Sequence, residues 1–270
     1  MTNIDASYMN HFRLTGKILF QSLALYFCTY FICLSLNAER LPPNSKPVLH
    51  LITSSSIAPY VISEKDSGIA VDIIREALAL KGYRVHFTYS TNRRVLAELE
   101  RDHVDGAFNL PYSDQEANHL YLSQPIVAYE NVVVTLAEQK LKLSEVSDLT
   151  NLQLVVFQNA SLYLPDAYAQ MAKLNPNIEE VSDQKSQVYM LFMRRAQAII
   201  LDRRIFEYFR SQLSHQSAVF DDPYKVHTLF SQAPRFAIFR DQSVRNEFNE
   251  GLNTLVNNGR YQAIVAKYIN

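Results

Sequence analysis

Segments with the spacing of strands alternate with segments that have the spacing of helices along most of this chain. Short apolar or alternating runs predict strands, and runs with apolar residues three and four positions apart predict helices. The clearest pair is a strand over residues 48–53 and a helix over residues 69–80, with Gly82 placed where a helix ends. Alternation of this kind predicts an α/β fold with mainly parallel strand pairing.

The remaining segments continue the alternation. Strands are predicted over residues 84–89, 106–110, 130–136, 152–157, 198–201 and 235–240, and helices over 93–101, 162–173, 186–195, 205–212, 244–257 and 261–269. Residues 220–228 are predicted to be irregular. Because the pattern restarts after the strand at 130–136, we expect one lobe from 48–132 plus 234–270, a second from 137–230, and two crossover segments. A cleft between two lobes is a usual place for a small ligand.

The first 38 residues have the pattern of an export signal. Residues 18–36 are almost entirely apolar and carry no charge, Arg13 and Lys17 precede them, and Ala38 follows. A basic start, an apolar stretch and a small residue are typical of a secretory signal. The stretch also approaches the length of about 20 residues that crosses a bilayer, so an uncleaved inner-membrane anchor is the alternative. Both interpretations place the rest of the chain outside the cytoplasm, in the periplasm.

Composition excludes several classes of function. The chain has 26 Lys plus Arg against 27 Asp plus Glu, a formal net charge of −1, which argues against nucleic acid as a partner. With only 6 glycines, the usual glycine-built phosphate loops are absent. Both cysteines, Cys28 and Cys33, lie in the apolar stretch, so the exported chain would have no disulfide and no thiolate metal site. We predict no catalytic residues, no metal site and no cofactor.

Six short motifs occur in an order that resembles one known family. They are A-P-Y at 58–60, G-I-A-V-D at 68–72, L-E-R-D-H-V-D-G-A at 99–107, Y-L-S-Q-P at 121–125, A-I-I-L-D at 198–202, and R-F-A-I-F-R with G-R-Y and K-Y between 235 and 268. Together they resemble the bacterial extracellular solute-binding proteins of family 3. The resemblance implies a two-lobed Venus-flytrap fold with two crossovers. It also implies a monomer that captures a small polar solute, amino-acid-like or related, for an inner-membrane permease or a sensor.

The resemblance also implies a binding site, which can be carried over position by position. The implied ligand-binding residues are Ser54, Tyr60, Arg94, Asn109, Ser113, Glu116, Asn159, Ser161 and Asp202. The family's aromatic lid falls on Ile57, so its ring is missing, and the arginine that clamps a ligand carboxylate falls on Glu116. The amine-binding aspartate is retained as Asp202.

Several of these residues have a second interpretation. Arg94 would replace the missing clamp, or it is a solvated residue at a helix start. Asp202 would contact the ligand, or it caps a helix or pairs with Arg203 or Arg204. Glu116 is a contact or an exposed helix residue, and backbone N–H groups at 159–161 would receive an anion.

Two other classes of function remain possible interpretations of the sequence. One is an enzyme on the same scaffold, resembling the dehydratase relatives of the family. An enzyme needs a poised acid or base in the cleft, and Glu116 is the one candidate in this sequence. The other is a degenerate sensory or structural module. We predict binding rather than catalysis.

Overall fold

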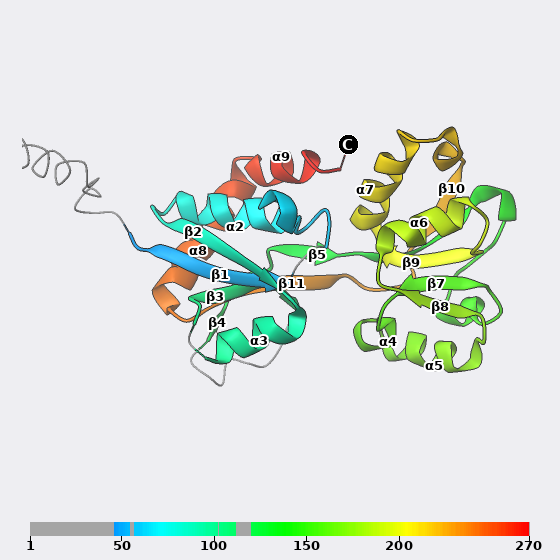
Figure 1. The fold of residues 1–270 in the computed structure, drawn as a ribbon, viewed down its shortest axis with the longest axis horizontal. Helices are drawn as coiled ribbons and strands as arrows, with labels where there is room; N and C mark the ends of the chain where they lie inside the picture. Colours follow the sequence, from blue (N-terminus) through cyan, green and yellow to red (C-terminus); the bar gives the residue numbers. More distant parts are fainter. Residues whose placement is uncertain (1–45, 55–56, 102, 112–119, 270) are drawn as a thin grey trace, which may run out of the picture. The chain divides into compact units, whose positions relative to one another are not determined.

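Two mixed β-sheets organise the chain in the computed structural model, which describes residues 46–54, 57–101, 103–111 and 120–269 (Figure 1). The first sheet has the order β2-β1-β3-β11-β4, and β5 also pairs with β11. Its strands are β1 Val48–Ser54, β2 Arg84–Ser90, β3 Gly106–Pro111, β4 Tyr121–Leu122, β5 Val127–Tyr129 and β11 Ala233–Phe239. Strand β1 is parallel to β2 and β3, whereas β11 is antiparallel to β3, β4 and β5.

The second sheet has the order β10-β6-β9-β7-β8. Its strands are β6 Asn131–Leu136, β7 Leu154–Phe157, β8 Ile178–Val181, β9 Ala198–Asp202 and β10 Tyr224–His227. Strand β7 is parallel to β8 and β9, and β6 is antiparallel to β9 and β10. The chain crosses between the sheets from β5 to β6 and from β10 to β11, which confirms the predicted two-crossover α/β fold. The strand pairing is mixed, not mainly parallel as predicted.

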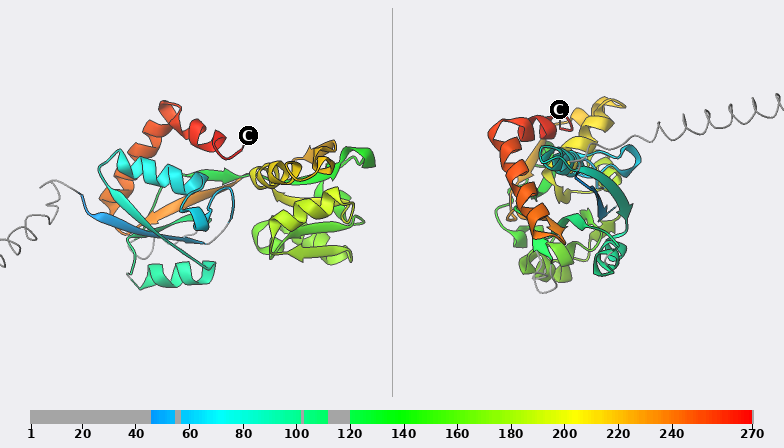
Figure 2. Two further views of the ribbon diagram at one scale, coloured as in Figure 1. Left: turned by 45° about the horizontal axis from the view of Figure 1, so that its top comes forward. Right: turned by 90° about the vertical axis from the view of Figure 1, so that its left-hand side faces the viewer.

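Helices cover both faces of each sheet. They are α2 Ile69–Ala79, α3 Asn92–Glu100, α4 Ala160–Tyr163, α5 Asp166–Leu174, α6 Gln184–Phe192, α7 Arg203–Ser214, α8 Gln242–Asn257 and α9 Arg260–Ala266. In the first sheet α2 and α8 lie on one face and α3 on the other (Figure 2). Along β6, Val132 and Val134 join the core with α6 and α7, while Val133 joins the core with α5. This alternation is the period of two that a strand requires.

The C-terminal helices return to α2. The α-carbon of Gly251 on α8 lies so close to α2 that an added Cβ would be 2.2 Å from the carbonyl oxygen of Ala77. A glycine is therefore required at this helix crossing, because any side chain would push the two backbones apart. Arg260 of α9 also forms a two-bond ion pair with Glu76 of α2, with both N–O distances 2.7 Å.

Three local features differ from the prediction. The helix expected over 162–173 is divided into α4 and α5, because Pro165 lacks the N–H that a continuous helix needs. Residues 220–228, expected to be irregular, contain β10. Strands β4, β5 and β8 were not predicted, and β8 carries Glu179 and Glu180 on a sheet edge where an apolar pattern is weak.

Some predictions fall outside the described residues. These are the export signal over residues 1–38 and the site residues Ser113 and Glu116. Within residues 46–269, apart from the gaps, no helix is both long and apolar enough to cross a membrane.

Candidate functional site

A closed turn after β1 places Tyr60 in the protein interior. The N–H groups of Tyr60 and Val61 donate to the carbonyl of Ile57, at 2.9 and 3.2 Å. The carbonyls of Pro59 and Tyr60 then accept from the first N–H groups of α2, at 2.9 and 3.0 Å. These bonds satisfy donors that a helix start leaves free. The side chain of Tyr60 is 0% exposed.

Tyr60 connects this turn to Tyr129, at the first crossover, and to Asp202, at the end of β9. Its ring lies against that of Tyr129 on β5, with centroids 4.4 Å apart and an angle of 36° between the planes. Its hydroxyl donates to Oδ1 of Asp202 at 2.9 Å. Burial raises the pKa of Tyr60 well above its ordinary value, so the hydroxyl stays protonated and remains a donor.

Asp202 ends β9 and caps the start of α7. Its Oδ1 accepts from the N–H groups of Arg204 and Ile205, at 3.0 and 3.1 Å, in addition to the Tyr60 hydroxyl. Its Oδ2 accepts from the N–H of Glu130 at 2.8 Å. The carboxylate therefore accepts four hydrogen bonds, three at Oδ1 and one at Oδ2, so most of its acceptor capacity is used. Burial raises the pKa of Asp202, against the effect of the donors. The predicted helix cap is therefore present, while the ligand contact stays a prediction.

The first crossover is fixed to the start of α7 through Glu130. The N–H of Arg203 donates to the carbonyl of Glu130 at 2.9 Å. The guanidinium of Arg203 binds the Glu130 carboxylate through two bonds of 2.9 and 2.8 Å, and this pair lowers the pKa of Glu130. Two-bond pairs of this kind fix orientation as well as charge. Arg204 instead donates to the carbonyl of Ala128 at 3.2 Å.

Asn109 has an unusual backbone inside β3. Its φ is +62°, and the register between β3 and β11 shifts between Phe236 and Ala237. Such irregularities redirect a side chain, and asparagine tolerates the left-handed region better than most residues. Its amide nitrogen donates to the Tyr129 hydroxyl at 2.8 Å, and that hydroxyl lies 3.1 Å from the amide oxygen.

Arg235 on β11 completes this group. The central carbon of its guanidinium lies 4.4 Å from the centre of the Tyr129 ring, and Nη1 donates to the carbonyl of Pro234 at 3.3 Å. Its side chain is half-buried. Among the described residues, no carboxylate pairs with it. A continuous series of contacts therefore runs from the Arg235 guanidinium to the Tyr129 ring, from that ring to the Tyr60 ring, and from the Tyr60 hydroxyl to the Asp202 carboxylate.

We call Tyr60, Asn109, Tyr129, Asp202 and Arg235 the crossover cluster. Sequence analysis identifies three of them but misses Tyr129 and Arg235. The signal for Arg235 is its place as the first residue of the C-terminal motif at 235–240. The signal for Tyr129 is its place immediately before the strand predicted over 130–136.

Other predicted residues lie outside this cluster. The side chain of Arg94 is 70% exposed, and its Nε lies 3.4 Å from a carboxylate oxygen of Glu98 on the same helix. This matches the interpretation as a solvated helix residue, and a joint contact of Arg94 and Asp202 with one ligand stays a prediction. Ser54 ends β1 and is half-buried.

The predicted anion position at 159–161 is altered by a neighbouring acid. Asn159 has φ +60° and its N–H donates to a carboxylate oxygen of Glu180 at 2.9 Å. Helix α4 has only 4 residues, and both Asn159 and Ser161 are exposed. A ligand anion at this N–H would meet a carboxylate that already accepts from it.

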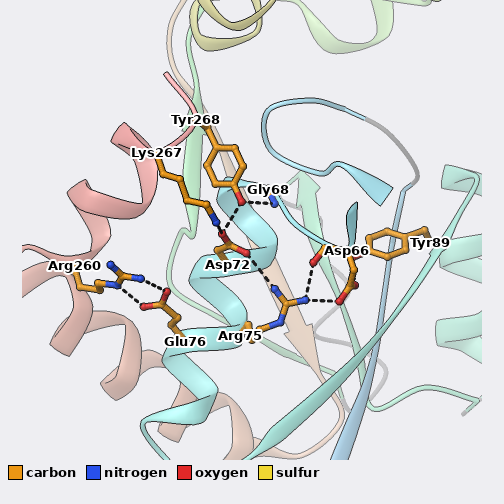
Figure 3. Close-up of polar contacts among 9 residues, drawn as sticks. All are labelled: Asp66, Gly68, Asp72, Arg75, Glu76, Tyr89, Arg260, Lys267 and Tyr268. Carbon is orange, nitrogen blue, oxygen red and sulfur yellow. Dashed lines mark hydrogen bonds and ion pairs between the residues drawn. The ribbon is translucent and has the colours of Figure 1, made fainter. Parts of the chain in front are cut away.

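A second group of residues lies around the start of α2 (Figure 3). We call it the α2 cluster, and its members are Gly68, Asp72, Arg75, Lys267 and Tyr268. Asp72 is 8% exposed, and its Oδ2 accepts from the ammonium of Lys267 at 2.8 Å and the hydroxyl of Tyr268 at 2.6 Å. Its Oδ1 accepts from Arg75 at 3.1 Å. The Tyr268 hydroxyl also accepts from the N–H of Gly68 at 3.0 Å. The C-terminal residues therefore hold the start of the helix whose N–H groups bind the Tyr60 turn.

Gly68 is the point where the two clusters meet. Its φ is +132°, and an added Cβ would lie 2.4 Å from the carbonyl oxygen of Tyr60. Both the backbone angle and the close approach require glycine. Arg75 extends the α2 cluster to Asp66, which also accepts from the Tyr89 hydroxyl at 2.6 Å.

Neither a surface hollow nor a metal-binding group adds to these clusters within the described residues. An open hollow of about 670 Å³ lies over α2, α8 and α9, with Leu80, Leu255 and Ala263 in its wall, and no predicted site residue lines it. Within the described part of the chain, no group of three His, Cys, Asp or Glu side chains is placed to hold a metal ion.

Comparison with known proteins identifies the family pattern over nearly all of the described chain. The model of the bacterial extracellular solute-binding proteins, family 3, matches residues 49–270. An ancestral cationic amino acid solute-binding protein is 17% identical, with 83% of this chain and 96% of that chain covered and a TM-score of 0.65. No curated protein sequence matches.

Two further solved structures have the same fold. The second substrate-binding domain of Lactococcus lactis GlnP, in an open conformation, is 18% identical, with 85% of this chain and 97% of that chain covered and a TM-score of 0.61. A histidine kinase sensor domain similar to periplasmic binding proteins is 14% identical, with coverage of 84% and 97% and a TM-score of 0.62. At these identities the structures show the fold alone.

Proposed function

The chain belongs to the bacterial extracellular solute-binding proteins, family 3, and on this premise we propose that it captures a small polar solute, an amino acid or a related compound, between two lobes. The lobes are residues 48–132 plus 234–270 and residues 137–230, and the protein acts as a monomer. It delivers the solute to an inner-membrane permease or reports it to a sensor. The similarity to a substrate-binding domain and to a sensor domain supports both partners.

The observation that carries this proposal is the hydrogen bond between Tyr60 and Asp202. It joins the turn after β1 to the start of α7, next to the point where Glu130 crosses between the sheets. A solute can drive closure only if it binds one arrangement of the lobes better than another. The buried hydrogen bond between Tyr60 and Asp202 fixes one arrangement of the residues at the crossover. A solute that binds this arrangement better than another would shift the protein toward it.

Binding is favoured over catalysis by the state of the acids at the crossover. Asp202 is 2% exposed and already accepts four hydrogen bonds, and the carboxylate of Glu130 is paired with Arg203. A general base must lie within reach of the proton that it removes. A buried, hydrogen-bonded Asp202 and a Glu130 held by an arginine are poorly placed for that role, so the crossover supports recognition of a solute.

Native mass spectrometry tests the binding function. The protein is purified from a periplasmic extract without denaturation and sprayed under gentle conditions. We expect a one-to-one complex with a small organic molecule that is lost on collisional activation. Detection of the bare protein mass alone, together with no small molecule in the supernatant after denaturation, would contradict the proposal.

Export is proposed separately, on the pattern of residues 1–38, because family members act outside the cytoplasm. Residues 1–45 fused to alkaline phosphatase should give enzyme activity, since this enzyme folds only after export. An inactive fusion retained in the cytoplasm would overturn this part. The mass of the exported fusion distinguishes cleavage near Ala38 from retention as an anchor.

A further inference from the structure

We propose that Arg235 binds the acidic group of the solute and that the solute lacks an α-ammonium group, so that this protein takes carboxylic acids such as 2-oxo acids in preference to α-amino acids. The inference rests on the proposed solute-binding function and narrows its solute class.

Arg235 carries a charge that no described carboxylate balances. It is half-buried and has no carboxylate partner among the described residues, whereas Arg203 pairs with Glu130 and Arg194 pairs with both Glu138 and Asp222. A cation that is partly removed from water without an opposite charge is costly, and a bound anion would offset that cost.

The guanidinium of Arg235 lies over the Tyr129 ring, with its central carbon 4.4 Å from the ring centre, and Nη1 donates to the carbonyl of Pro234. An arginine has five N–H donors, so these contacts do not exhaust its capacity. Two of its N–H groups can form a fork that matches the two oxygens of a carboxylate.

The position of Arg235 in the sheet also favours a role in binding. It lies opposite Pro111, at the carboxyl end of β3, and β3 is parallel to β1. Ligands of open α/β sheets bind outside the carboxyl ends of such strands. Two residues before Pro111, Asn109 has its strained backbone and holds the Tyr129 hydroxyl. Strain of this kind is concentrated at functional sites.

The crossover cluster has no accessible carboxylate for an ammonium group, which is why we propose a solute without one. Asp202, where the family resemblance places the amine contact, is 2% exposed and already accepts from four donors. Because Asp202 is buried, an ammonium group could not reach it without a rearrangement of the surrounding residues. Glu130 is neutralised by Arg203. The crossover cluster therefore offers a cation to the solute but no available carboxylate, which matches an acid without an ammonium group.

Calorimetric titration with matched pairs of solutes tests this proposal. The pairs are pyruvate and L-alanine, 2-oxoglutarate and L-glutamate, and phenylpyruvate and L-phenylalanine, which differ within each pair at the amine position and between pairs in size. We expect at least one 2-oxo acid to bind at least tenfold more tightly than its amino acid. Arg235→Gln should weaken that binding at least tenfold, and Arg235→Lys should restore part of it because the charge is kept.

Arg245→Gln is the matched control. Arg245 is also half-buried, lies 6.0 Å over the ring of Tyr121, and donates to the carbonyl of Leu122 at 2.7 Å. Its loss should leave the affinity unchanged. Circular dichroism checks that each variant is folded, and if Arg235→Gln does not fold, Arg235→Lys carries the comparison.

The proposal is overturned if an amino acid binds as tightly as its 2-oxo acid, if Arg235→Gln or a folded Arg235→Lys keeps full affinity, or if none of the six compounds binds. Native mass spectrometry separates this failure from that of the proposed function. A co-purified solute that has no carboxylate, or that has an α-amino group, rejects the solute class but leaves solute binding intact.

Discussion

The hydroxyl of Tyr60 donates a 2.9 Å hydrogen bond to Oδ1 of Asp202, a residue 142 positions further along the chain. Tyr60 belongs to the motif at 58–60 and Asp202 to the motif at 198–202, which are weak signals when each is taken alone. The structure brings them together at the crossover, where the same carboxylate also holds the N–H of Glu130. One contact therefore unites the turn after β1, the first crossover and the start of α7.

Replacing Tyr60 by phenylalanine should destabilise the protein while leaving its ring stacking in place. The change removes one donor to a buried carboxylate, and hydrogen bonds to charged groups contribute on the order of 1.5–3 kcal/mol. Urea denaturation should show a loss of that size. The control is Tyr163→Phe, at a ring that is 47% exposed, for which the change should be below about 0.5 kcal/mol. Equal effects of the two substitutions would contradict this role of Tyr60.

Replacing Gly68 by alanine should cost more than the same change at Gly82. Both glycines have positive φ, +132° and +84°, but only at Gly68 would the new Cβ meet an atom, the carbonyl oxygen of Tyr60 at 2.4 Å. Gly82→Ala should cost about 1–2 kcal/mol from the backbone alone. Gly68→Ala should add a further ~1–3 kcal/mol from overlap. Chemical denaturation of the two variants measures the difference, and a similar cost for both would show that the close approach is not maintained.

Tyr268→Phe should loosen the Tyr60 turn although the two tyrosines are not in contact. The substitution removes the acceptor for the Gly68 N–H and a donor to Asp72, and Gly68 lies against the Tyr60 carbonyl. We expect hydrogen exchange of the Tyr60 and Val61 amides to become at least about fivefold faster, the equivalent of losing a bond of about 1 kcal/mol.

The control for this experiment removes a different contact between α2 and the C-terminal helix α9. Arg260→Gln removes the ion pair with Glu76 but does not touch Gly68. It should leave exchange at Tyr60 and Val61 unchanged. If both variants accelerate exchange equally, the effect comes from general loosening of α9 and not from the α2 cluster.

Stability should fall as the pH drops below about 6.5, the ordinary pKa of histidine, because of His227. Burial lowers the pKa of His227, with a smaller contribution from Lys225, and its Nε2 lies 3.0 Å from Oγ1 of Thr135. The folded state then binds fewer protons at this residue than the unfolded state, so the penalty on folding grows as pH falls from about 6.5 toward the lower folded pKa and is constant below it. Denaturation midpoints of wild type and His227→Gln, measured from pH 8 to pH 5, should converge toward acid pH. A constant difference would exclude this cause.

Local sequence signals were sufficient for most elements of the fold. Strand β1, helix α2 and the C-terminal helix α8 have clear apolar periodicity, because each buries one defined face. The edge strands β8 and β10 escaped detection because both are half-exposed, and a sheet edge imposes no strong apolar pattern.

The candidate site was only partly accessible to sequence analysis, because its contacts depend on strand register. Arg235 reaches Tyr129 through the pairing of β11 with β5, and all five strands of the second sheet lie between these two strands in the sequence. Nothing local specifies that pairing. Likewise, Asp202 is recognisable as a helix cap or a ligand contact from its motif, but only the approach of Tyr60 shows that its donors are already in place.

Small-angle X-ray scattering tests the central claim most directly. The small molecule released from the natively purified protein is returned in increasing amounts to protein that has been stripped by unfolding and refolded. Capture between two lobes predicts that the radius of gyration decreases and reaches a plateau near one equivalent. A radius of gyration that does not change at saturating solute would contradict closure of the lobes on a captured solute.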